Sequence, residues 1–258
     1  MNNPLKSATA YYDPTLPQVV RNPYPSLLAL QRHDPAHWSP KLKAWVLTRY
    51  DDVKVALTST EMSVDRIKPF YENLPAAEKS VLSELMRYLT LWLVFRDPPE
   101  HTRLRQLMSR AFTMRAVEVL RPGVENICDM LTDRLPRGQA FDFVNDFAMQ
   151  LPAMVIMDLL GVPRDHMFHL KSCSDRMQLF IGSARNAPDK YERAAEGAQE
   201  MAALFRGLIA ERRAEPRDDL ISAFIAAREA DDAMTEDELV AACMLVMFGG
   251  HETSANLL

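Results

Sequence analysis

Two short stretches of the sequence carry residues whose types and spacing suit chemistry as well as packing. The first, DPPEHTRLRQLMSRAF, begins at Asp97 and places His101 and Arg105 four residues apart. On a helix this spacing stacks both side chains on one face, where they could donate charge-assisted hydrogen bonds to one anionic group, such as a propionate or a phosphate. Taken alone, the pair is more typical of a solvated pair on a surface helix.

The second stretch, FGGHETSANLL, follows a strongly apolar run. Gly249 and Gly250 each cost a helix up to about 1 kcal/mol relative to Ala, and Glu252 is costly to bury without a partner. A large flat ligand against the helix would compensate, because glycines leave room for it while Glu252 and Thr253 could hold water and relay protons. The spacing by itself favours a plainer alternative, in which Gly249-Gly250 ends one helix, Thr253 or Ser254 caps another and Glu252 is solvated.

Both stretches are expected to lie on helices. Asp97 is predicted to cap the first helix, with Glu100 completing a capping box and an apolar stripe following over residues 104–112. Thr235 and Glu238 form a second box, which predicts a terminal helix over residues 236–258. The first half of that helix is apolar on every side, which indicates a buried central helix.

The rest of the chain is predicted to be mostly helical, with one small hairpin. Only 8 of the 258 residues are glycine, which argues against an all-β fold. The hairpin is expected around a turn at Pro40/Lys41, and Pro122 and Gly123 are expected to bend or interrupt the helix that begins near Met114. The other helices are expected over residues 24–32, from 50, and over 76–89, 142–160 (ended by Gly161), 165–180, 189–213 and 218–229. With no repeat and no low-complexity linker, residues 1–258 are predicted to form a single domain.

Composition and charge exclude several classes of function. The net charge of -5, without a basic arm, predicts no nucleic-acid partner. Cys128, Cys173 and Cys243 are widely spaced and form no CxxC pair, which indicates a reducing compartment without a disulfide framework or a zinc site. The N-terminus lacks the pattern of a secretory signal, and the longest apolar run, residues 239–248, is too short to cross a bilayer. These features predict a cytoplasmic protein without a membrane partner.

The two stretches and their flanks resemble a known family. FRDPPEHTRLRQLMSRAFT and AMTEDELVAACMLVMFGGHETSANLL are similar to the two most recognisable N-terminal signatures of bacterial cytochrome P450 monooxygenases. AHWSPKLKAWVLTRYDDV resembles the first sheet of that family, LPAMVIMDLLGVP its mid-chain helix and RDDLISAFIAA the segment before its central helix. The resemblance implies a mainly α cytochrome P450 fold with a small N-terminal sheet. It also implies a haem-thiolate monooxygenase that hydroxylates an apolar small molecule with O2 and electrons from ferredoxin and ferredoxin reductase.

The resemblance also implies where the haem would lie. By their positions in the family motifs, His101 and Arg105 would bind the propionates of haem b. Gly249 and Gly250 would line the groove over the haem, where dioxygen enters.

Catalysis and substrate contact follow from the same resemblance. Glu252 and Thr253 would be the catalytic pair that delivers protons. Leu245 and Phe248 would face the substrate, as could residues around 89–94 and 177–181. Arg103, Arg110 and Arg115 could form a basic face for ferredoxin, although three ordinary solvated arginines explain the pattern equally well.

The sequence departs from the family in one respect that bears on the metal. The cysteine that ligates iron in this family lies in a Gly-rich loop, and neither that loop nor the ExxR helix is found in this sequence, so no metal ligand is predicted. The three cysteines lie in helical patterns and are expected to be buried and inert. We therefore interpret the chain as the N-terminal part of a monooxygenase, inactive and poor at binding haem by itself. The alternative is a haem-free helical protein, derived from such an enzyme, that acts by binding or regulation.

Overall fold

The computed structural model describes residues 12–112, 114–182, 187–229 and 232–258. These residues belong to two compact units, Met1–Ser63 and Val64–Leu258, and each unit is described by itself. The single domain expected from the sequence therefore stays a prediction. Among the described residues, no helix is both long and apolar enough to cross a membrane.

The first unit contains the predicted hairpin. Its strands pair antiparallel, with Trp38 opposite Trp45, and the two indole rings meet edge to face with their centroids 5.5 Å apart. Lys43, in the connecting turn, has a positive φ of 53°. The elements of this unit are α1 (Pro17–Arg21), α2 (Tyr24–His33), β1 (Ala36–Ser39), β2 (Ala44–Leu47) and α3 (Tyr50–Thr58).

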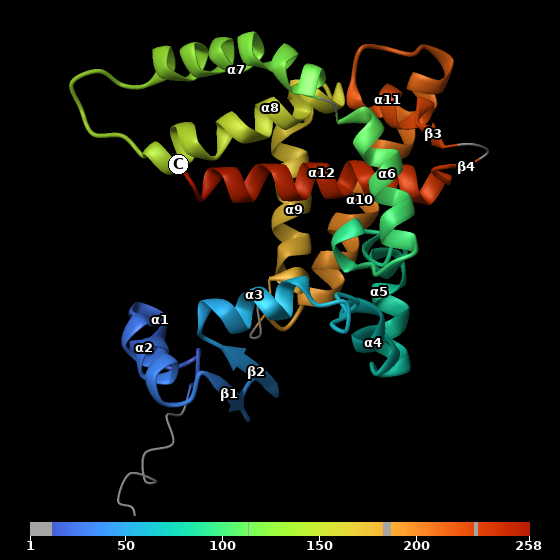
Figure 1. The fold of residues 1–258 in the computed structure, drawn as a ribbon. Coiled ribbons are helices and arrows are strands. Elements are labelled where there is room, and N and C mark those ends of the chain that lie inside the picture. Colours follow the sequence, from blue (N-terminus) through green and yellow to red (C-terminus); the bar gives the residue numbers. More distant parts are fainter. Residues whose placement is uncertain (1–11, 113, 183–186, 230–231) are drawn as a thin grey trace, which may run out of the picture. The chain divides into compact units, whose positions relative to one another are not determined.

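The second unit is a bundle of helices with one minimal hairpin (Figure 1). Its early elements are α4 (Ile67–Glu72), α5 (Ala76–Leu89), the 3-10 turn η1 (Leu93–Phe95), α6 (Glu100–Ala111) and α7 (Met114–Arg134). The π-helical turn η2 (Val144–Ala148), α8 (Gln150–Leu160), the 3-10 turn η3 (Arg164–His166), α9 (Met167–Ile181) and α10 (Lys190–Ala214) follow. The last elements are α11 (Leu220–Ala226), β3 (Arg228–Glu229), β4 (Asp232–Ala233) and α12 (Glu236–Ala255).

Helix α12 runs through the middle of the second unit (red in Figure 1), as the sequence predicts. The Thr235–Glu238 capping box opens it, with each side chain bonded to the backbone N–H of the other residue. It packs against α5, α8, α10 and α11. The helix continues unbroken past Gly249 and Gly250, so the alternative in which these glycines end one helix is wrong.

Several expected boundaries differ from the structure. Asp97 does not cap α6, which begins three residues later, because its carboxylate accepts a hydrogen bond from the Val64 backbone N–H. Helix α7 is not interrupted and continues through Pro122. The helix expected over residues 218–229 is shorter, because Asp219 caps α11 through the Ser222 N–H and the chain turns into β3 after residue 227. Helix α4 and the β3–β4 hairpin carry no periodic pattern long enough to predict them.

A buried ion pair fixes the helices that surround α12. Arg212 of α10, fully buried, donates from Nε to Asp219 at 2.5 Å and from Nη2 to the Gly161 carbonyl at 2.6 Å. Gly161 ends α8 with a φ of 71°, the left-handed conformation that glycine adopts without strain. One guanidinium therefore joins the end of α8 to α10 and to the start of α11.

Candidate functional site

One face of α12 is not fully covered by the rest of the unit. Residues spaced i, i+3, i+4, i+7 and i+8 from position 245 are each half-buried or exposed, whereas the residues of the opposite face, at 243, 247, 251 and 255, are buried. We call this surface the open face of α12; its members are Leu245, Phe248, Gly249, Glu252 and Thr253. Five of the residues implicated by the family resemblance thus lie together on one side of α12. Outside this face, Val246, Gly250 and Ser254 are also incompletely covered.

The two glycines differ in their surroundings. A Cβ built on Gly249 would meet no atom within 4 Å, so this glycine lies where the helix surface is open. A Cβ on Gly250 would lie 2.5 Å from Ile156 Cδ1 and 2.8 Å from Cγ1, because α8 packs closely against α12 there. Gly250 therefore lets two helices approach, and Gly249 leaves a gap beside the open face.

The acid and the alcohol of the open face are both held by hydrogen bonds. The Thr253 hydroxyl donates to the Gly249 carbonyl at 2.6 Å, one helical turn earlier. Because this bond uses the hydroxyl proton, the oxygen remains available as an acceptor on the open face. The Gln178 side-chain amide of α9 donates to Glu252 Oε1 at 3.3 Å, and Gln178 Oε1 is buried without a partner.

His251 lies beside this pair but on the buried side of α12. Burial lowers its pKa from the ordinary value, and the nearby Lys171 lowers it further, whereas Asp175 and a hydrogen bond to the Met149 carbonyl raise it. The net shift is downward, so the ring is neutral at pH 7. Its Nε2 atom is buried and has no partner among the described residues.

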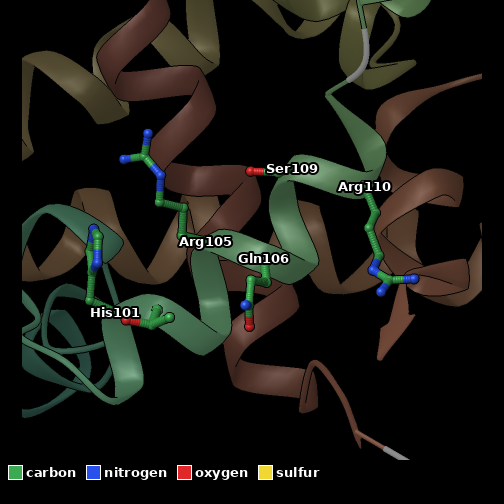
Figure 2. Close-up of a pocket in the computed structure, with 6 residues that line it drawn as sticks. His101, Arg105, Gln106, Ser109 and Arg110 are labelled. Atoms are coloured by element: carbon green, nitrogen blue, oxygen red, sulfur yellow. The ribbon is translucent and has the colours of Figure 1, made fainter. Parts of the chain in front are cut away.

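Helix α6 presents the predicted anion-binding pair on one side. Figure 2 shows His101 and Arg105 pointing the same way, while Arg110 points to the other side of the helix. They contribute to a hollow of about 480 Å³ that Thr102, Gln106, Ser109 and Arg110 also line. Among the described residues neither His101 nor Arg105 forms an ion pair, so both can donate hydrogen bonds to an anion.

Arg103 has a different environment from Arg105. It points toward the start of α12, where it binds Asp232 at 3.2 Å and also bonds to Glu238, whose side chain is only 7% exposed. Because Arg103 joins α6 to α12, it is not a solvated member of a basic docking face. Arg110 is exposed, and the Arg115 side chain lies outside the described residues.

A chain of aromatic rings connects the segment before α6 with the open face. Trp92, just before η1, stacks on Phe95 with the centroids 6.2 Å apart and contacts Phe248 at 5.2 Å. The segment that leads into α6 is therefore packed on α12 next to Gly249. Together with the ion pair at Glu238, this contact gives α6 one attachment near the open face and one at the start of α12.

Two of the three cysteines, all of which lie within the described residues, do not suit an iron–thiolate bond. Cys243 is completely buried in α12, and burial raises the pKa of its thiol far above the usual range. Burial also raises the pKa of Cys173 to about 11, against a smaller lowering by Arg176. Both therefore remain protonated thiols at neutral pH, whereas metal ligation requires a thiolate. Cys128 lies half-buried in α7.

Cys173 also belongs to a cluster with His169 and Glu200, whose possible metal-ligating atoms lie within 4.8 Å of one another. Arg176 occupies both oxygens of Glu200, at 2.9 and 2.6 Å, and lies 3.4 Å from the Cys173 sulfur. A fixed positive charge in this position repels a metal cation. The cluster is best described as an ion-pair network between α9 and α10.

Comparison with known proteins identifies a matching family. The model of the cytochrome P450 family matches residues 37–258. The vitamin D(3) 25-hydroxylase of Pseudonocardia autotrophica is 33% identical over 92% of this chain and 56% of its own length. The 6-deoxyerythronolide B hydroxylase of Saccharopolyspora erythraea is 34% identical over 83% of this chain and 52% of its own. The chain thus spans little more than half of these curated relatives.

Solved structures agree with the sequence comparison. The crystal structure of P450BioI in complex with an acyl carrier protein bearing hexadec-9Z-enoic acid matches with a TM-score of 0.83 and 27% identity, over 93% of this chain and 60% of that one. The ligand-free P450 monooxygenase TamI matches with a TM-score of 0.72 and 33% identity, over 93% and 55%. The predicted mainly α fold with a small sheet is confirmed.

Proposed function

Since this chain belongs to the cytochrome P450 family of haem-thiolate monooxygenases, we propose that α6 and the open face of α12 form two sides of a haem b site. The observation that carries the proposal is the open face itself, where Leu245, Phe248, Gly249, Glu252 and Thr253 are incompletely covered on a helix whose residues 238–244, 247, 251 and 255 are buried. His101 and Arg105 bind the two propionates, and the gap beside Gly249 admits the flat ring system. When bound there, haem b would supply the iron chemistry of the monooxygenase reaction.

The proposed proton path uses groups that this chain holds in place. Glu252 is half-buried, and Gln178 fixes one of its oxygens, so the carboxylate stays at the edge of the open face. Thr253, with its proton directed to the Gly249 carbonyl, accepts a hydrogen bond from water on the same face. Glu252 would take a proton from solvent and pass it to such a water, which Thr253 holds in place by accepting its hydrogen bond. Gln178 acts by positioning Glu252 and does not itself transfer protons.

The residues fit the propionates and one face of the haem, but not the iron ligand. Cys173 and Cys243 are buried thiols with raised pKa values, and Cys128 lies on α7. We therefore propose that this chain alone is inactive and gives no thiolate-ligated iron.

An apolar substrate over Leu245 and Phe248, and electrons from ferredoxin and ferredoxin reductase, are proposals for the whole enzyme that rest on family membership. A cytoplasmic location is likewise a proposal.

Titration of the chain with haemin, followed by difference absorbance, tests the proposed site. Arg105→Gln is expected to weaken binding about fivefold, since an exposed charge-assisted hydrogen bond contributes about 1 kcal/mol. Haemin dimethyl ester, which lacks free carboxylates, should bind equally weakly to the wild-type chain and to the variant. Arg137→Gln removes an exposed arginine from another part of the chain and serves as the matched control. Equal affinity of haemin for wild type and Arg105→Gln would instead favour the haem-free binding protein.

A further inference from the structure

A second hollow, of about 330 Å³, is enclosed largely by aromatic rings. Phe70 of α4 meets Phe180 of α9 edge to face at 5.6 Å, and Phe180 lies 6.0 Å from Tyr191 of α10. Phe95 of η1 completes the lining. Four separate elements thus contribute apolar surface to one hollow, which suits the apolar body of a small molecule.

Two cations stand at the same hollow. The Arg66 guanidinium lies 5.0 Å from the ring centroid of Phe95, and the Lys190 ammonium lies 5.0 Å from that of Tyr191. Neither forms an ion pair among the described residues. Burial, and to a smaller extent the charge of Glu78, raise the pKa of the Tyr191 phenol. Glu78 does not line the hollow, so the lining carries two positive charges and no negative one.

The walls of this hollow continue to the open face of α12. On one side Phe95 stacks on Trp92, which contacts Phe248. On the other side Ile181, which also lines the hollow, lies one helical turn after Gln178, which binds Glu252. A molecule held in the hollow is therefore bounded by two elements that both touch the proposed catalytic helix.

We infer that this hollow binds a substrate with a long apolar body and an anionic group, a carboxylate in the simplest case. Arg66 and Lys190 hold the anion at the rim, and the aromatic rings hold the adjoining apolar chain. The inference rests on the proposed function, because it names the class of substrate for that site.

Fluorescence quenching of Trp92 tests the inference without haem. Trp92 is the tryptophan of the second unit, so replacing Trp38 and Trp45 of the first unit by Phe isolates its signal. The probes are 12-bromododecanoate, 12-bromododecanol and 12-bromododecyltrimethylammonium, since bromine quenches indole at short range and Phe95, which lines the hollow, stacks on Trp92. The carboxylate is expected to bind about tenfold more tightly than the alcohol, with the cation weaker still.

Variants assign that preference to the two cations. Arg66→Gln combined with Lys190→Gln should reduce the tenfold preference for the carboxylate to about twofold or less, while the affinity for the alcohol is unchanged. Lys68→Gln, on the same helix α4 but outside the lining, should keep the preference. The alcohol affinity reports that each variant is folded. A carboxylate that binds no better than the alcohol, or a preference that survives the double substitution, overturns the inference.

Because haem is absent throughout, these outcomes are independent of the haemin titration. Failure of the haem site would leave this binding intact, and failure of this binding would leave the haemin result intact.

Discussion

Alanine substitution at the two adjacent glycines of α12 should have opposite effects on stability. In a helix interior, Gly→Ala gains about 1 kcal/mol from backbone propensity. At Gly249 nothing lies within 4 Å of the new Cβ, so the full gain is expected. At Gly250 the Cβ would lie 2.5 Å from Ile156 Cδ1, and overpacking of this kind costs about 1–3 kcal/mol.

The predicted free energies of unfolding follow from these terms. Gly249→Ala should be about 1 kcal/mol more stable than the wild type, and Gly250→Ala between equal and about 2 kcal/mol less stable. For a domain of this size, 1 kcal/mol corresponds to about 2–4 °C in Tm. The two variants should therefore differ by several degrees, although they differ in sequence only by the position of one methyl group.

Thermal and urea unfolding followed by circular dichroism measures both values. A double-mutant cycle with Ile156→Ala, which removes both contacting atoms, should show that Gly250→Ala costs less when Ile156 is shortened. No such coupling is expected for Gly249→Ala. If Gly250→Ala were as stable as Gly249→Ala, or if Gly249→Ala were clearly destabilised, the assignment of one glycine to the gap and the other to helix packing would be wrong.

Three further predictions concern charged and titratable groups. Arg103→Gln should lower the free energy of unfolding by about 1–3 kcal/mol in urea denaturation, because the buried carboxylate of Glu238 loses its positively charged partner. Arg105→Gln should change it by less than about 0.5 kcal/mol, and equal losses would contradict this. Burial lowers the pKa of His251 in the folded chain, so the unfolded chain takes up the proton first as the pH falls. The contribution of neutral His251 to the free energy of unfolding should therefore be fully present above about pH 6.5 and be lost as the pH falls below that value. In His251→Gln the free energy of unfolding, measured across this pH range, should decrease less steeply, and an unchanged slope would refute the assignment. Iodoacetamide should alkylate Cys128 well before Cys173, since burial raises the pKa of Cys173 to about 11, and peptide mass spectrometry showing the reverse order would be inconsistent with the buried thiol.

The sequence allowed most helices to be predicted, because their signals are local. The Thr235–Glu238 box and the left-handed Gly161 mark helix ends through their own side chains or backbone, and the structure confirms both. The predicted Asp97 box failed, although its residues fit the pattern, because the carboxylate binds the backbone of Val64, 33 residues away. A competing partner so distant in sequence is not visible in a local motif.

The candidate site was predictable only in part for the same reason. Residue types and spacing selected the members of the open face, and the family resemblance gave them roles. That Gly250 faces α8 while Gly249 faces the gap depends on how two helices pack, and that Gln178 holds Glu252 depends on a contact between α9 and α12. The difference between Arg103 and Arg105 also arises from tertiary structure, because only one of them reaches an acid of α12.

The central claim is that haem lies against the open face of α12, within reach of His101 and Arg105. Paramagnetic line broadening by haemin measures this directly in a chain with 13C-labelled methyl groups, with gallium protoporphyrin as the diamagnetic control. Leu245 methyl signals on the open face should broaden strongly, and those of Met247, buried on the opposite face, should broaden much less. Uniform broadening of both residues, or broadening confined to methyl groups of α7 and α8, would contradict the claim.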